Sequence, residues 1–240
     1  MGTCIGNRNT YRDSMQKSCS TFENRLRLSY RDWKHSVGAI NSYCPEDGTV
    51  PKASIEYIMD EIGLTPVYKD KNSHLEELLD EFLKDRVSER KWLIYLALFL
   101  CGGDESSKLE YLCQTINNKD MTKSTIPGSE LRKILESLME LSVLIIPRLG
   151  KIEEHKERIS KVEISEAVDE WWPDNSKDIY TFEEVQLWGR KCRSFTTGEA
   201  RAAMLKLALG KKDELPSERE VEVPTTNAPE DNLIAGDKEI

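Results

Sequence analysis

The chain has 240 residues, of which 38% are hydrophobic and 32% charged, a composition typical of globular proteins with a charged surface. Its net charge of -9 argues against general nucleic-acid binding. Its six cysteines include no CxxC pair and no cluster at zinc-ligand spacing, so we expect reduced thiols in a cytosolic protein without a disulfide framework. We expect neither a secretory signal nor a membrane span, because the longest apolar run, residues 92–101, is too short to cross a bilayer.

The N-terminus carries the pattern of a lipid-modified segment. Gly2 stands where myristate is attached, although Gly6 occupies a position at which Ser or Thr is preferred. One myristoyl chain binds a membrane only marginally, so a second signal is needed, and palmitate on Cys4 or the basic residues nearby can supply it. Residues 1–34 contain seven Lys or Arg against three acids. We therefore expect residues 1–19 to bind an anionic membrane surface, with an ordinary unmodified N-terminus as the alternative.

Residues 43–54 follow the spacing of an EF-hand loop, in which a glycine occupies the sixth position, an aliphatic residue the eighth and glutamate the twelfth. Gly48 and Val50 occupy the sixth and eighth positions. Apolar residues at i, i+3, i+4 and i+7 then predict an exiting helix packed on a core. These residues are Ile55, Ile58, Met59 and Ile62. The matching stripe of an entering helix consists of Phe22, Leu26, Tyr30, Trp33 and Val37.

The same template recurs along the chain, which is the observation that most constrains the fold. A third loop, beginning near residue 119, has Ile126 at its eighth position and Glu130 at its twelfth. A fourth, beginning near residue 173, has Tyr180 and Glu184 at the same positions. The gap between the first and third loops has room for one more, which we place near residues 81–92.

Loops of this kind pair through a short strand contact at the eighth position, so an even number of repeats is expected. Ile126 should then face Tyr180, and Val50 should face Val87 or a neighbour. The sequence predicts an all-α fold with four EF-hand-like helix-loop-helix repeats in two pairs. The expected segments are an acylated basic segment (1–19), the first pair (20–102), the second pair with a C-terminal helix (103–210) and a disordered acidic tail (211–240).

Residues 20–195 resemble the neuronal calcium sensor and calcineurin-B-like group of the EF-hand superfamily. The resemblance lies in the N-terminal acylation pattern, the four loop templates, the segment 96–116 between the second and third repeats, and a longer connection before the fourth. It implies an all-helical fold with a hydrophobic groove that grips a partner helix, often at a membrane.

The first and third loops lack the ligands that calcium requires, since the ion needs six to eight oxygens and its affinity follows the number of charged ligands. In the first loop Asp47 is the one acid at a ligand position, and Ser54 replaces the twelfth-position glutamate. In the third loop Lys119 and Lys123 occupy ligand positions. We expect neither loop to bind calcium.

The fourth loop is the one candidate for a metal. Its ligand positions hold Lys177 and two uncharged residues, while Asp174 and Asp178 each lie one step away. Deleting one residue from the frame would make these two aspartates ligands, with Glu184 closing the site. We expect no cofactor, and a calcium sensor that uses this loop alone is the alternative.

The remaining features favour a binding protein. The histidines are scattered and no phosphate-binding glycine loop is present, so we do not expect an enzyme. Trp171, Trp172 and Trp188 are candidate anchors for a protein partner, because large aromatic residues are frequent hot spots, with core packing as the alternative role for at least one of them. Residues 198–212 have the pattern of a short amphipathic helix that either fills the protein's own groove or packs beside it.

Together these features predict an adaptor at the cytoplasmic face of a membrane, cytosolic when not acylated, that binds a protein helix without calcium. A structural component of a cytoskeletal or ciliary assembly is a further alternative, in which acylation is incidental and binding permanent. Such a component should resist detergent extraction, whereas an acylated adaptor should not.

Overall fold

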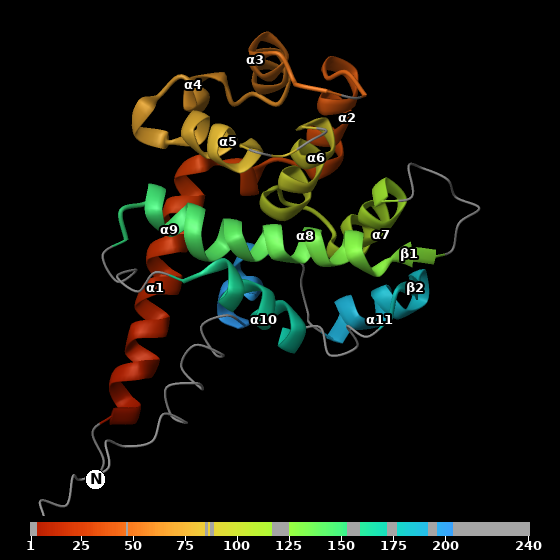
Figure 1. Ribbon diagram of the computed structural model, residues 1–240. Coiled ribbons are helices and arrows are strands. Elements are labelled where there is room, and N and C mark those ends of the chain that lie inside the picture. The colour runs from red at the N-terminus through yellow and green to blue at the C-terminus, as the bar shows by residue number, and fades with distance from the viewer. Residues whose placement is uncertain are drawn as a thin grey trace, which may run out of the picture.

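The computed structural model describes residues 4–46, 48–84, 86, 89–116, 125–152, 159–171, 177–191 and 196–203. Within these residues the chain is helical apart from two short strands and the connecting turns (Figure 1). The all-α prediction is therefore confirmed.

The N-terminal part of the chain begins with one long helix and continues with shorter ones. Its elements are α1 (Cys4–Leu26), η1 (Leu28–Tyr30), α2 (Trp33–Tyr43), α3 (Lys52–Glu61), α4 (Thr65–Tyr68), η2 (Lys71–Ser73), α5 (Leu75–Leu83) and α6 (Glu89–Leu100). We refer to α2 through α6 as the N-terminal group. Helix α5 shows why these segments fold, because its residues Leu75, Leu78, Leu79 and Phe82 follow i, i+3, i+4, i+7 spacing and all are buried. Burying each such side chain contributes about 1.5–3 kcal/mol to the free energy of folding.

The prediction of a single entering stripe from Phe22 to Val37 is wrong. Helix α1 ends at Leu26 because Arg27 adopts a left-handed conformation with φ of 57°. Helix α2 then begins anew at Trp33, where the carboxylate of Asp32 accepts a hydrogen bond from the Lys34 amide and caps the helix. Tyr30, in the break between the two helices, is 72% exposed.

The C-terminal part contains the remaining named elements. These are α7 (Glu105–Ile116), β1 (Thr125–Pro127), α8 (Gly128–Glu140), the π-helical turn η3 (Leu141–Ile145), α9 (Ile146–Leu149), α10 (Lys161–Trp171), β2 (Ile179–Thr181) and α11 (Phe182–Lys191). We refer to α7 through α11 as the C-terminal group. Helix α8, the turn η3 and α9 follow one another without a break, and Figure 1 shows them as one long helix crossing the molecule. Residues 197–203 form a further short helix.

Strands β1 and β2 pair in antiparallel fashion in the predicted register, with Ile126 opposite Tyr180. Both side chains are buried. Gly128 follows β1 directly, and its amide donates to the Asp178 carbonyl at 2.8 Å. A Cβ atom at this position would lie 2.5 Å from the Lys177 carbonyl oxygen, so the close approach of the two loops requires glycine.

The predicted contact of Val50 with Val87 or a neighbour stays a prediction, while another contact joins the first loop to α6. Val87 lies outside the described residues, and the Val50 amide donates to the Glu89 carboxylate at 2.7 Å. Glu89 is the first residue of α6, so a side chain of the second predicted repeat reaches the first loop.

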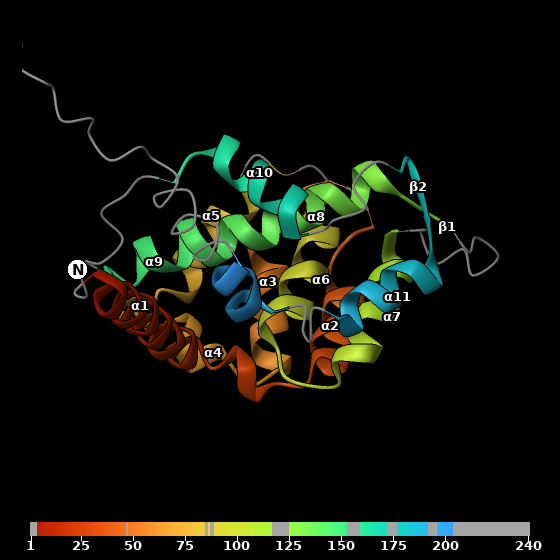
Figure 2. The same cartoon turned by 90° about the horizontal axis from the view of Figure 1, so that it is seen from below.

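The helices pack in two related arrangements. Helix α2 packs against α6 in the N-terminal group, while α7 packs against α11 and α8 against α10 in the C-terminal group. Figure 2 shows α1 beside α9 at one end of the molecule and α11 beside α7 at the other. The long helix from Gly128 to Leu149 joins the two groups, because α5 packs against η3 and α9.

Candidate functional site

Two glutamates occupy equivalent places beside the strand pair. Glu130 and Glu184 each lie in the first turn of the helix that directly follows β1 or β2. Each stands four residues after the strand residue at the centre of the pair, Ile126 or Tyr180. These are the twelfth positions of the predicted third and fourth loops, where a bidentate calcium ligand would stand.

The Glu184 carboxylate is engaged by a lysine and by its own helix end. Lys177 donates to it at 2.7 Å, and the Thr181 amide donates to it at 2.8 Å. The Thr181 hydroxyl accepts the Glu184 amide in return, at 3.2 Å, which completes a capping box. The hydrogen bond from Lys177, followed by that from the Thr181 amide, lowers the pKa of Glu184.

The Glu130 carboxylate also faces ammonium groups. Lys133, on the same helix, lies 3.0 Å from it, and Lys91 of α6 lies 3.7 Å from it. The hydrogen bond from Lys133 is the largest cause of the lowered pKa of Glu130. Because Lys91 belongs to the N-terminal group, this glutamate also links the two groups of helices.

The surroundings of these glutamates favour a fixed cation over a metal ion. A lysine ammonium neutralises each carboxylate and occupies oxygen atoms that a calcium ion would need. Asp178 is exposed, and its backbone carbonyl accepts a hydrogen bond from the Gly128 amide. Across the residues that the structure describes, no group of three or more His, Cys, Asp or Glu side chains is placed to hold a metal.

The other predicted site residues lie at the margins of the described structure. Gly2, Trp172 and Asp174 fall outside the described residues. Cys4 begins α1 and Trp171 ends α10, but the surroundings of both side chains fall outside as well.

Trp188 lies within α11, and its side chain is likewise beyond what is described. Lipidation at Gly2 and Cys4 and partner binding at the three tryptophans therefore stay predictions. Of the described helices, none combines the length and the apolar character needed to cross a membrane.

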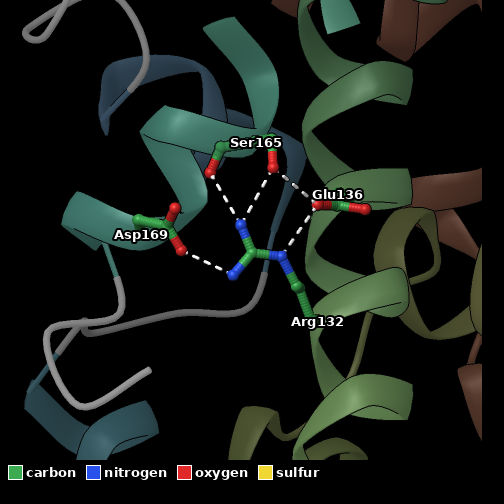
Figure 3. A network of polar contacts seen from close by, with 4 residues as sticks. All are labelled: Arg132, Glu136, Ser165 and Asp169. Atoms are coloured by element: carbon green, nitrogen blue, oxygen red, sulfur yellow. Dashed lines mark hydrogen bonds and ion pairs between the residues drawn. The ribbon is translucent and has the colours of Figure 1, made fainter. Parts of the chain in front are cut away.

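A polar network that the sequence analysis missed ties α8 to α10 (Figure 3). The Arg132 guanidinium contacts Asp169 at 2.6 Å, Glu136 at 3.1 Å and the Ser165 hydroxyl at 2.9 Å. Ser165 in turn donates to Glu136 at 3.1 Å. The i, i+4 spacing of Arg132 and Glu136 is visible in the sequence, but their partners on α10 are not.

A second missed arginine joins the two groups of helices beside an open cleft. Arg86 lies over the rings of Phe82 and Trp92, at 4.3 and 5.1 Å from their centroids, and pairs with Glu140 of α8 at 2.7 Å. The neighbouring cleft has a volume of about 640 Å³. Its lining includes Lys84, Arg86, Trp92, Lys133, Glu136 and Glu140. Its lining carries both carboxylates and cations, so its charge selects no single class of small ligand.

The apolar faces of α2, α3, α5 and α6 close on one another. They surround a cavity of about 30 Å³ whose lining is almost wholly apolar. A cavity of this size has room for water molecules but not for a partner helix. These four helices therefore leave no room for a partner helix between them, and the predicted partner groove stays a prediction.

A helix is nevertheless bound elsewhere on the surface of the fold. Residues 197–203 lie against α1 and η3, with Thr197, Ala200 and Arg201 buried. The prediction of a short C-terminal helix from residue 198 agrees with the described part of this segment.

Comparison with models of known protein families, with curated proteins and with solved structures yields no match. The function is therefore inferred from the residues and their geometry.

Proposed function

We propose that the chain is a membrane-tethered, EF-hand-like adaptor that binds a helical segment of a protein partner and does not need calcium. The observation that carries the proposal is the Lys177–Glu184 ion pair at 2.7 Å. Counted from residue 173, these residues are the fifth and twelfth of the fourth loop, so a side-chain ammonium lies beside the carboxylate that would complete a calcium site.

The order and packing of the helices support four EF-hand-like repeats. The helix pairs α2 and α3, α5 and α6, α7 and α8, and α10 and α11 each enclose one predicted loop. In both groups the first helix packs against the last, and in the C-terminal group the two middle helices also pack together. The pairing of Ile126 with Tyr180 joins the third and fourth loops at their eighth positions.

The proposed calcium independence follows from charge. A calcium ion entering the fourth loop has to displace the Lys177 ammonium and compete with the Thr181 amide for the same carboxylate. In the third loop it has to displace Lys133 and Lys91 from Glu130. The loops are then held in one shape by contacts that do not respond to the calcium concentration.

The adaptor role is supported by the helix of residues 197–203, which lies in a surface site between α1 and η3. The proposed partner uses either this site or the apolar surface that α2, α3, α5 and α6 now cover. Membrane tethering is supported by α1, because Figure 1 shows its N-terminal end projecting from the body of the molecule. Acyl groups on Gly2 and Cys4 would then contact the membrane without burying the helical core.

Calorimetric titration of the full chain with calcium tests the proposal. We expect no binding at micromolar calcium for the wild-type chain. A micromolar site that Glu184→Gln abolishes would identify the chain as a calcium sensor instead. Lys177→Gln is the matched variant, since it removes the ammonium charge and keeps an uncharged polar side chain at this position.

Vesicle flotation tests the tether. With the N-myristoylated chain we expect binding to vesicles containing anionic lipid, and loss of this binding in Gly2→Ala. Cys4→Ser should leave the protein exchanging between membrane and cytosol in cells. Full membrane retention of Gly2→Ala, or mass spectra of the N-terminal peptide without myristate, would contradict the tether.

A further inference from the structure

Arg201 is fully buried, and each of its three guanidinium nitrogens has an acceptor. Its Nε donates to the Ser142 carbonyl at 3.0 Å, one terminal nitrogen to the Gln16 amide oxygen at 3.2 Å, and the other to the Glu23 carboxylate at 2.6 Å. Gln16 and Glu23 lie on α1, and Ser142 lies in η3. The three acceptors thus match the planar fork of a guanidinium group.

The backbone of the long helix makes the Ser142 carbonyl available. In the π-helical turn the Ile146 amide donates to Leu141, one residue earlier than in an α-helix. The next amide in this register would belong to Pro147, which has no N–H to donate. The Ser142 carbonyl is therefore left without its backbone donor, and Arg201 takes that place.

The same site selects small residues beside the arginine. Thr197 and Ala200, which precede Arg201 by four residues and by one, are buried against the body of the protein. A Cβ atom at Gly198 would lie 3.1 Å from the Gln16 amide nitrogen, so this end of the helix approaches α1 closely. The site accepts a helix in which small residues occupy one face next to an arginine.

A buried ion pair is a weak source of stability, because the cost of removing its charges from water offsets most of their attraction. Apolar residues of similar size would hold residues 197–203 against α1 at least as well. The Glu23–Arg201 pair, in which the arginine is fully buried and the glutamate mostly so, instead gives the site selectivity for a guanidinium group, and π-helical turns often mark functional positions.

We propose that Gln16, Glu23 and the Ser142 carbonyl form a guanidinium-recognition site that accepts an arginine from a helix of the protein partner. Arg201 occupies this site from within the chain and competes with the partner's arginine. The inference rests on the proposed adaptor function, and it specifies the partner segment as a helix with small residues one and four positions before an arginine.

The test is fluorescence anisotropy with a labelled peptide of residues 196–210, added to the full chain. Arg201→Ala empties the site, so we expect this variant to bind the peptide at least tenfold more tightly than the wild-type chain does. The peptide that carries Arg201→Lys should bind the variant at least tenfold more weakly, because an ammonium cannot reach three acceptors. Adding Glu23→Gln to the variant should remove most of the binding.

Arg148→Ala is the matched control, since it removes an exposed arginine of α9 and leaves the site occupied. Circular dichroism establishes whether each variant is folded. If Arg201→Ala unfolds, Arg201→Lys replaces it, and methylguanidinium should raise the thermal midpoint of that variant more than methylammonium does. Equal binding of the two peptides, no binding to a folded variant, or failure of both variants to fold would each overturn the recognition site in favour of a structural role.

Failure of the guanidinium site can be distinguished from failure of the proposed adaptor function. If Arg201→Ala and Glu23→Gln capture a protein partner from cells as well as the wild-type chain does, the adaptor function is retained and the proposed guanidinium site is wrong. If no variant captures a partner and the chain does not float with vesicles, the adaptor itself is wrong.

Discussion

In the C-terminal group the two loops meet through the paired strands β1 and β2, whereas in the N-terminal group the Val50 amide donates to the Glu89 carboxylate. The strand pair buries Ile126 against Tyr180 and fixes both backbones at once. The carboxylate contact fixes one amide through a side chain that has its own rotational freedom. The comparison suggests that the two loop pairs differ in how strongly they resist separation.

The largest expected effect comes from Ile126→Ala. The side chain is fully buried, so we expect a loss of about 4 kcal/mol in the free energy of unfolding. The matched variant Val50→Ala should cost about 2 kcal/mol, because it removes fewer buried atoms than Ile126→Ala does. Urea denaturation measures both losses. Equal losses would mean that the two loop pairs are held equally firmly.

Glu89→Ala tests the carboxylate contact of the N-terminal group. It leaves the part-buried Val50 amide without its charged acceptor, and we expect a loss of about 1.5 kcal/mol. Glu56→Ala, at an exposed position of α3, is the control and should change the unfolding free energy by less than about 0.5 kcal/mol. If the two substitutions cost the same, the Val50–Glu89 hydrogen bond contributes nothing to the contact between the loops.

Arg132→Lys tests the network that ties α8 to α10 in the C-terminal group. Lysine keeps the charge but cannot contact Asp169, Glu136 and Ser165 together, so we expect a loss of about 1 kcal/mol. Hydrogen exchange should show faster exchange in α10 and little change in α3. Unchanged exchange in α10 would show that apolar packing alone holds this helix.

The smallest effect concerns pH. The pKa of Glu184 is lowered in the folded chain, first by the hydrogen bond from Lys177. Its contribution to stability is present above the unfolded pKa of about 4.3 and is lost as pH falls through the lower folded value. Thermal midpoints should therefore fall less steeply between about pH 5 and pH 3 in Glu184→Gln than in the wild-type chain. In Lys177→Gln the Glu184 pKa should rise toward its ordinary value, and an NMR titration measures this rise.

The register of the strand pair was predictable because it depends on local spacing. Ile126 and Tyr180 each stand four residues before a glutamate, and apolar positions of the following helix fix the frame. The break between α1 and α2 was not predictable from periodicity, because Phe22, Leu26 and Trp33 keep helical spacing across it. A left-handed arginine leaves no periodic signal in the sequence.

The engagement of the two glutamates was predictable only in part. The sequence places Lys177 at the fifth position of the fourth loop, but its ion pair with Glu184 is seen only in the structure. The contact of Lys91 with Glu130 depends on how the two groups of helices pack, so nothing local to either residue indicates it. The acceptors around Arg201 are likewise assembled from α1 and η3, which lie far from it in the sequence.

The uninterrupted helix from Gly128 to Leu149 has a mechanical consequence. Glu130, beside the strand pair, and Ser142, beside Arg201, are twelve residues apart on it, a separation of about 18 Å along the axis. A rod of this length acts as a lever: a tilt of about 10° at the strand pair would move the Ser142 carbonyl by about 3 Å. A displacement of that size exceeds the tolerance of a hydrogen bond, so a small reorientation of the paired loops would be enough to release the guanidinium at the far end.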